Sequence, residues 1–131
     1  MIVVDASAMV EALVGHNPDP ELLDSLAGDL FAPHLLDVDV LSVLRSLALA
    51  RKLDVEVARE AVRDHFAFAI ARQDAEPLAE RIWQLRHQFG AYDACYLALA
   101  EALDVPLHTC NRKLDTRGHR AEVRVFAPTS R

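Results

Sequence analysis

The chain opens with a short apolar segment that ends in an aspartate. Residues 1–4 read Met-Ile-Val-Val, and Asp5, Ala6 and Ser7 follow directly. An unbroken run rich in β-branched residues is typical of a strand buried on both faces, as in the centre of a parallel sheet. Ligands of open α/β sheets bind at the carboxyl ends of the strands. Asp5 is therefore a candidate site residue, although it could equally be the N-cap of a following helix.

Helical and strand patterns alternate along the rest of the chain. Strands are predicted at 1–4, 29–32, the end of 66–71, 106–110 and 123–126. Helices are predicted at 6–14, 21–27, 33–52, 55–65, 75–89 and 92–103, with a short one at 112–117. This order predicts an α/β protein, built as a three-layer α/β/α sandwich around a central, mainly parallel sheet of four or five short strands.

Length and composition narrow the class of protein. The 131 residues fit a single domain, 1–131, and 52% of them are hydrophobic. No apolar run reaches the roughly 20 residues of a membrane-spanning helix, and the N-terminus has no basic segment typical of a signal peptide. The two cysteines lie in different predicted elements, and no Cys/His spacing matches a zinc site. We therefore expect a cytoplasmic protein with reduced thiols.

The balance of charged residues limits the kinds of binding partner that the protein can have. Lys and Arg number 14, Asp and Glu number 20, and the formal net charge is −6. Such a balance argues against a protein that holds nucleic acid by bulk electrostatic attraction. It is compatible with an enzyme whose acids gather in one place and bind a cation.

Three of the acids are set within apolar runs or at a strand end, whereas most of the others are spaced as on a solvated helix face. Asp5 is the first. At ~100° per residue, Asp39 borders the apolar stripe of the helix at 33–52, while Asp37 lies about 200° away and should face water. Asp93 opens a nearly all-apolar helix. For Asp39 and Asp93, the alternative role is an ordinary stabilising position in the first turn of a helix.

Converging carboxylates need a compensating charge. At one strand end they would repel each other and raise each other's pKa values, whereas a divalent cation would keep them ionised. Ligands that are all oxygen atoms favour Mg²⁺ or Mn²⁺. A metal held by a few carboxylates keeps water molecules that can be activated as nucleophiles, and it can stabilise a phosphoryl oxygen. The three acids therefore predict metal-assisted chemistry on a phosphate ester.

Four segments of the chain form a larger set. They are Val-Val-Asp-Ala-Ser at 3–7, Leu-Asp-Val-Asp-Val-Leu-Ser-Val-Leu-Arg at 36–45, Ala-Tyr-Asp-Ala-Cys-Tyr-Leu-Ala-Leu-Ala-Glu at 91–101 and Leu-His-Thr-Cys-Asn-Arg-Lys-Leu at 107–114. The set resembles a PIN domain, and in size and order it is most similar to the VapC-type toxins of bacterial toxin–antitoxin pairs. The resemblance implies a PIN-like fold, a Mg²⁺- or Mn²⁺-dependent endoribonuclease, a homodimer, and a small VapB-type antitoxin whose tail covers the acidic site.

The resemblance also implies roles for single residues. Asp5, Asp39 and Asp93 would be the catalytic acids that hold the metal, and Ser7 would support them through its hydroxyl. A cluster of basic residues follows the penultimate strand: Arg112, Lys113 and Arg117, with His119 and Arg120 close by. We expect this cluster to contact the RNA backbone; the alternative is a solvated, salt-bridged face.

Two departures from the family pattern affect the expected activity. The family usually has glutamate at the position of Asp39, and the aspartate side chain is shorter by one C–C bond, ~1.5 Å. The family often has a further acid where this chain has Asn111, whose amide can hydrogen-bond metal-bound water but adds no charge. Asp115, one helical turn further on, is either a substitute for that acid or an ordinary surface residue.

Three functions remain open on the sequence. The first is the toxin just described, cleaving RNA with metal-activated water. The second is a catalytically weak PIN-like module that binds antitoxin or RNA, suggested by Asp39 and Asn111. The third, a phosphoacceptor receiver domain, has a similar build but would need paired acids at the end of its first strand, where this chain has Asp5 followed by Ala6.

Overall fold

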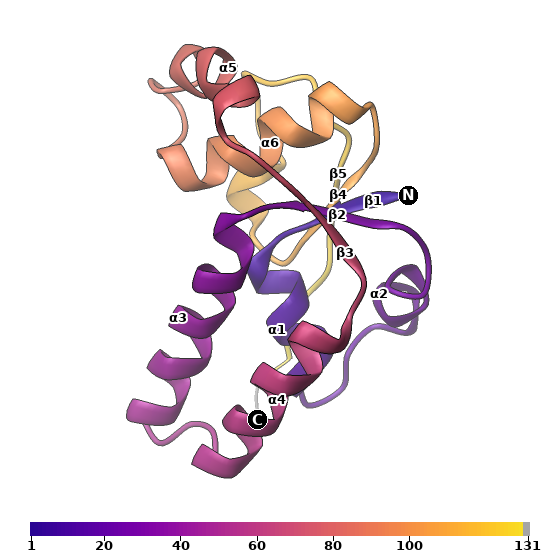
Figure 1. Ribbon diagram of the computed structural model, residues 1–131, viewed down its shortest axis with the longest axis vertical. Coiled ribbons are helices and arrows are strands. Elements are labelled where there is room, and N and C mark those ends of the chain that lie inside the picture. The colour runs from indigo at the N-terminus through magenta and orange to yellow at the C-terminus, as the bar shows by residue number, and fades with distance from the viewer. Residues whose placement is uncertain (130–131) are drawn as a thin grey trace.

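The computed structural model describes residues 1–129 as a five-stranded sheet covered by helices on both faces (Figure 1). The strands are β1 (Ile2–Val4), β2 (Leu30–Pro33), β3 (Ile70–Gln73), β4 (Leu107–Thr109) and β5 (Val123–Val125). The helices are α1 (Ala6–Val14), α2 (Pro20–Ser25), α3 (Leu35–Leu49), α4 (Val55–Ala67), α5 (Ala79–Gln84) and α6 (Ala91–Leu103), with 3₁₀ turns η1 (Glu76–Leu78) and η2 (Arg112–Leu114). The predicted three-layer α/β/α class is confirmed.

The strand order creates a crevice beside β1. The order is β3-β2-β1-β4-β5, and each neighbouring pair is parallel. The chain therefore builds outwards from β1 to β3 and then returns to the other side of β1. At such a reversal the connections leave the two central strands in opposite directions, which opens a ligand crevice at their carboxyl ends. The residues that follow β1 and β4 lie at this point.

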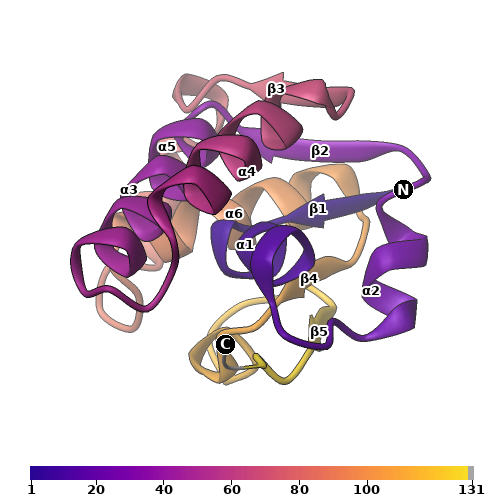
Figure 2. The ribbon, with the colours of Figure 1, turned by 90° about the horizontal axis from the view of Figure 1, so that it is seen from below.

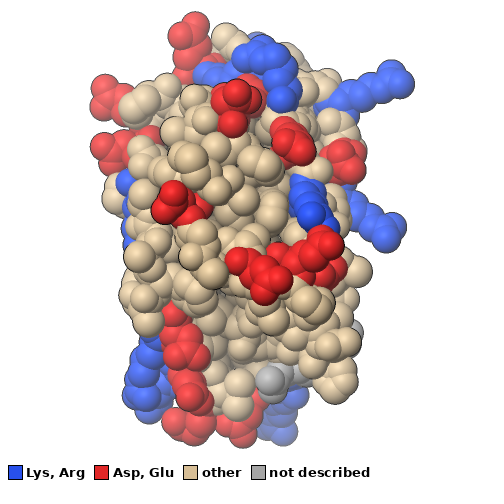
Figure 3. Space-filling model, turned by 90° about the vertical axis from the view of Figure 1, so that its right-hand side faces the viewer, with Lys and Arg blue, Asp and Glu red and all other residues tan. Residues whose placement is uncertain are grey.

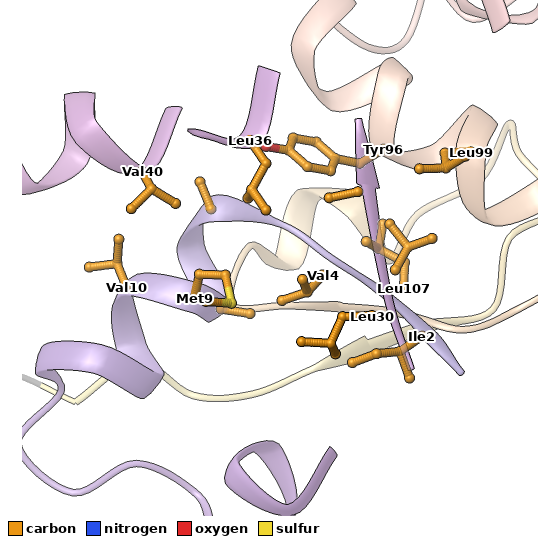
Figure 4. Packing of buried hydrophobic residues seen from close by; sticks show 14 of the residues in the cluster. Ile2, Val4, Met9, Val10, Leu30, Leu36, Val40, Tyr96, Leu99 and Leu107 are labelled. Carbon is orange, nitrogen blue, oxygen red and sulfur yellow. The ribbon is translucent and has the colours of Figure 1, made fainter. Parts of the chain in front are cut away.

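Helices α1, α3 and α4 pack together on one face of the sheet, and α5 and α6 lie on the other (Figure 1). Figure 2 shows the sheet from its face, with the strands side by side in the order β3, β2, β1, β4 and β5 and with α1 and α4 in front of them. Val3 and Val4 are fully buried, which explains the unbroken apolar run at the start of the chain. Side chains from β1, α1, α3 and α6 meet in the core, among them Val4, Met9 and Leu36 (Figure 4).

Most predicted helices differ from the structure by one or two residues at an end, and the short helix predicted at 112–117 is the 3₁₀ turn η2; two long helices differ more clearly. The predicted helix at 75–89 is η1, α5 and a series of turns, because the amides of Arg86 and Gln88 bond to carbonyls three residues back and wind the chain more tightly. The predicted helix at 33–52 is shorter at both ends. Pro33 still pairs with Gln73 in the sheet, and Arg51 adopts a left-handed φ of 57° that ends the helix.

The expectation that Asp37 faces water is wrong. Its carboxylate accepts hydrogen bonds from Arg72 at 2.8 and 2.9 Å and lies 2.8 Å from Nε2 of His65, which is fully buried. Burial by itself would raise the pKa of Asp37, but the bonds from Arg72 and His65 outweigh it and lower that pKa. Asp37 therefore ties the first turn of α3 to β3 and α4. The helical period could not reveal this, because a polar partner covers that face.

One face of the molecule carries charges of both signs. On the side where the N-terminus lies, acidic and basic side chains are interspersed among uncharged ones (Figure 3). No helix within residues 1–129 is long and apolar enough to cross a membrane. Cys95 and Cys110 are both free thiols, as predicted.

We expect Asp37→Ala to lower the free energy of unfolding by about 2–3 kcal/mol, because it leaves the Arg72 guanidinium and the His65 ring without their shared acceptor. The figure is below that of a fully buried pair because Asp37 and Arg72 keep 21% and 22% of their side chains exposed. Urea denaturation measures the change. Glu56→Ala is the control, since Glu56 forms an exposed pair with Arg59 at 3.9 Å and should have little effect. Equal stabilities of the two variants would contradict this role of Asp37.

Candidate active site

Asp5 combines the two roles that the sequence left open. It follows β1 and is the N-cap of α1, where one carboxylate oxygen accepts hydrogen bonds from the Ala8 amide at 2.9 Å and the Ser7 hydroxyl at 2.7 Å. The other oxygen accepts a hydrogen bond from the hydroxyl of Thr109. The side chain is buried, with 5% of the residue exposed. Asp5 is thus a helix cap that also faces the crevice at the ends of β1 and β4.

Thr109 was not predicted as a site residue. The register pairs Val4 with His108, so Asp5 and Thr109 are the next residues along the two strands. The Ser7 hydroxyl accepts a hydrogen bond from the Cys110 amide at 2.8 Å, which ties α1 to the segment after β4. A hydroxyl at the end of a buried strand was the signal available in the sequence, but only the pairing of the strands directs it at Asp5.

Burial dominates the electrostatics of Asp5. Loss of hydration raises the pKa of this carboxyl from its ordinary 3.8 to about 6, although the hydrogen bonds from Thr109, Ala8 and Ser7 oppose the rise. Asp39 adds to the rise through charge repulsion. The structure therefore brings Asp39 near Asp5.

Asp39 lies in α3, is partly exposed, and accepts a hydrogen bond from the Tyr96 hydroxyl at 3.0 Å. Burial and the charge of Asp39 raise the pKa of Tyr96, so this phenol stays a proton donor. Tyr96 was not predicted as a site residue either. Its place in an apolar helix gave no sign that its hydroxyl reaches an acid on another helix.

Asp93 lies in the first turn of α6 and is partly buried. Burial raises its pKa, repulsion by Asp39 raises it further, and Lys113 partly offsets the rise. Among the described residues, none donates a hydrogen bond to its carboxylate. Asp39 therefore interacts with both Asp5 and Asp93, and Asp93 keeps both oxygens available to a ligand.

The segment after β4 carries the other predicted residues. The Asn111 side-chain oxygen caps η2 by accepting a hydrogen bond from the backbone amide of Lys113 at 3.0 Å. The backbone amide of Asn111 donates a hydrogen bond to the Thr109 hydroxyl at 2.9 Å. Lys113 is exposed and close enough to lower the pKa of Asp93. Arg112, Arg117 and Asp115 are exposed, and within residues 1–129 they make no hydrogen bond or ion pair with the three acids.

The donor set suits a hard divalent cation in its chemistry. The three carboxylates and the hydroxyls of Ser7 and Thr109 offer oxygen ligands at this end of the sheet. Burial, and to a smaller degree repulsion by Asp39, raises the pKa of Asp5 and of Asp93, and a cation would relieve that repulsion. Within the part of the chain described, however, no three His, Cys, Asp or Glu side chains form a ready-made group for a metal. The acids influence one another electrostatically without closing around a common point.

A cavity of about 600 Å³ opens beside the site. Ser7 and Cys110 line its end nearest Asp5, and its walls are largely apolar, from α1, α3 and the chain near the C-terminus; they include Val10, Val43, Leu47 and Pro128. Glu11 lies in this wall, buried, and accepts a hydrogen bond from the Thr129 amide at 2.9 Å. The cavity could therefore receive apolar side chains next to the acids.

The raised pKa of Asp5 predicts a pH-dependent stability of the metal-free protein. Because its folded pKa (about 6) exceeds its ordinary value (3.8), the folded protein binds more protons than the unfolded chain between these values. The contribution of Asp5 to stability is therefore full below about pH 4 and is lost as the pH rises through 6. We expect Asp5→Asn to raise the free energy of unfolding at pH 7 on the order of 2 kcal/mol.

Urea denaturation in EDTA between pH 5 and 8 measures this change. The advantage of Asp5→Asn over the unsubstituted protein should shrink towards pH 5. Asp24→Asn, an exposed substitution on α2, is the control and should show no such trend. If the stability difference between Asp5→Asn and the parent is no larger at pH 8 than at pH 5, the assigned pKa shift is refuted.

The chain matches known proteins over most of its length. Residues 2–119 match the family model of the PIN domain. A VapC ribonuclease of Mycobacterium bovis is 41% identical over 118 residues, which cover 90% of this chain and 91% of that one. Ribonuclease VapC1 of Mycobacterium tuberculosis is 42% identical over 116 residues, 86% of each chain.

Solved structures share the fold at low sequence identity. VapBC2 from Rickettsia felis, bound to a DNA fragment from its promoter, aligns with a TM-score of 0.70 and 14% identity over 96% of this chain and 99% of that one. VapC20 of Mycobacterium tuberculosis, a toxin that cleaves the sarcin–ricin loop, aligns with a TM-score of 0.68 and 13% identity over 92% and 97%. The fold, the family model and the relatives agree with the resemblance seen in the sequence: the chain belongs to the PIN-domain family, in its VapC-type branch.

Proposed function

We propose that the protein is the toxin of a type II toxin–antitoxin pair and that it cleaves RNA as a Mg²⁺- or Mn²⁺-dependent endoribonuclease. The observation that carries this proposal is the grouping of Asp5, Asp39 and Asp93 at the carboxyl end of the sheet, where burial and repulsion raise the pKa of two of them. Relatives more than 40% identical are named ribonucleases, which supports the same activity for this chain.

The chain's own residues prepare the site for such a reaction. Asp5, Asp39 and Asp93 are the residues that would hold the metal, which when bound supplies an activated water and stabilises charge on a phosphoryl oxygen. Ser7 and Thr109 fix the Asp5 carboxylate in one orientation.

Two further groups face the substrate in this scheme. The oxygens of Asp93 accept no hydrogen bond from the described residues, so that one of them could take a proton from an attacking water while the other holds the metal. The exposed ammonium of Lys113, which lies near Asp93, would contact the scissile phosphate. Arg112 and Arg117 would extend this contact along the RNA backbone. For Asp115 we propose only a supporting role at the site.

A VapB-type antitoxin is the partner we assign to the cavity beside Ser7. Structures with this fold include the VapBC2 and FitAB complexes, and the largely apolar walls suit a peptide segment with apolar side chains. A segment lying there would reach the acids past Ser7 and cover them. The homodimer implied by the family resemblance stays a prediction, as does a cytoplasmic location, where an RNA-cleaving toxin would meet its substrate.

We expect Asp5→Asn and Asp93→Asn each to lower RNA cleavage about 100-fold or more, because each removes a carboxylate from the reacting centre. Cleavage of total RNA by the purified protein, with Mn²⁺ and with excess EDTA, and growth arrest on induction measure the effect. Asp24→Asn is the matched control and should retain full activity. Full cleavage by both site variants, or undiminished cleavage in EDTA, would refute the proposal.

A catalytically weak binding module is the second candidate, favoured by Asp39 and Asn111. Asn111→Asp keeps the cap on η2, because an aspartate oxygen can accept the same bond from the Lys113 amide, and it adds a charge to the site. We expect Asp39→Glu combined with Asn111→Asp to raise kcat/KM about tenfold. A nearly silent parent that gains 1,000-fold or more would instead identify the natural protein as the binding module, whereas robust parental cleavage would exclude that function.

A further inference from the structure

Tyr96 is almost completely buried, yet it carries a polar group that reaches the site. It lies in the middle of α6 with 2% of its surface exposed. Its ring points from α6 towards Leu36 in the core (Figure 4). The hydroxyl donates a hydrogen bond of 3.0 Å to one oxygen of Asp39. Within residues 1–129 this is the one hydrogen bond that either side chain makes.

The packing of Tyr96 does not require a hydroxyl. A phenylalanine ring would fill the same apolar space, whereas a buried hydroxyl costs free energy unless it finds a partner. The ring lies beside the fully buried Leu36 in the core (Figure 4), so the donor has a fixed position. Asp39, by contrast, is partly exposed and can rotate towards solvent. The bond therefore restrains Asp39 more than it restrains Tyr96.

The position of Tyr96 links two site acids. Asp93 and Tyr96 are three residues apart on α6 and so share one face of that helix. Asp39 belongs to α3, which packs mainly on α1 across the molecule. The bond from Tyr96 to Asp39 is thus a direct connection between the helix of Asp93 and the helix of Asp39.

The Asp39 carboxylate also lies in the neighbourhood of two like charges. Asp5 and Asp93 are both close enough for electrostatic interaction with it, and like-charged carboxylates repel one another. Without an attractive partner, a partly exposed carboxylate in this position would turn outwards to lower the repulsion. The Tyr96 hydroxyl is the attractive partner that faces inwards.

We infer that Tyr96 is a positioning residue whose hydroxyl holds the Asp39 carboxylate towards Asp5 and Asp93, so that the three acids can bind one divalent cation. This inference rests on the proposed function and adds to it the group that sets the place of the third acid. It assigns Tyr96 no direct contact with substrate or metal.

Tyr96→Phe tests this role, because it removes the hydroxyl and keeps the ring. Isothermal titration of Mn²⁺ into the full-length chain should show binding about five- to tenfold weaker, the effect of one hydrogen bond to a charged group. In cleavage assays kcat should fall by a similar factor, with little change in KM for RNA. Tyr92→Phe is the matched control, since Tyr92 is 71% exposed on the same helix, and it should change neither quantity.

A double-variant cycle separates positioning from a general effect on packing. In an Asp39→Asn background the further change Tyr96→Phe should have little additional effect on Mn²⁺ binding, because the carboxylate that the hydroxyl positions is gone. Thermal melting should show Tyr96→Phe within about 4 °C of the parent, a shift that leaves a domain of this size folded at the assay temperature.

Three results would overturn the inference while leaving the proposed function intact: unchanged Mn²⁺ binding in Tyr96→Phe, additive losses in the double variant, or a melting temperature so much lower that unfolding accounts for the weaker binding. A parent protein that neither binds Mn²⁺ nor cleaves RNA would refute the proposed function itself, and the inference with it.

Discussion

The pairing of β1 with β4 is the constraint on which the site depends. Its register sets Val4 beside His108 and makes Asp5 and Thr109 the first residues beyond the paired segment. The hydroxyl of Thr109 then meets one oxygen of Asp5, while the amide of Ala8 and the hydroxyl of Ser7 meet the other. A shift of one residue would turn Thr109 to the opposite face of the sheet. The same backbone pairing that builds the centre of the fold therefore also orients its most buried acid.

The cap and the site are one structure at Asp5. A carboxylate at the start of α1 satisfies amides that would otherwise lack partners, but its burial and the nearby Asp39 make the ionised form costly. The hydrogen bonds offset only part of that cost. A positive charge bound near Asp5 would stabilise the ionised form that burial disfavours. The free-energy cost of burying this carboxylate is offset by the stability of the well-packed core around it.

Helix α3 is held at its first two turns by contacts on different sides. Asp37 is anchored to Arg72 of β3 and His65 of α4, and Asp39 is anchored to Tyr96 of α6. The two aspartates are only two residues apart, and they point to different layers of the molecule. One of them ties the helix to the sheet edge, and the other faces the candidate metal centre. Their chemical identity does not distinguish these roles; their neighbours do.

Much of this protein could be predicted from its sequence. The apolar run before Asp5 and the alternation of strand and helix patterns predicted the fold class and its elements, and the acids set in apolar surroundings predicted the three candidate acids. These features are visible in the sequence because buried faces of helices and strands require apolar residues at regular spacing. The tertiary structure alone decided that Thr109 and Tyr96 serve Asp5 and Asp39, that Asp37 is tied inwards, and that the helix at 75–89 breaks into turns. Each of these depends on a partner distant in the chain, and a helical or strand period shows which face is covered without showing what covers it.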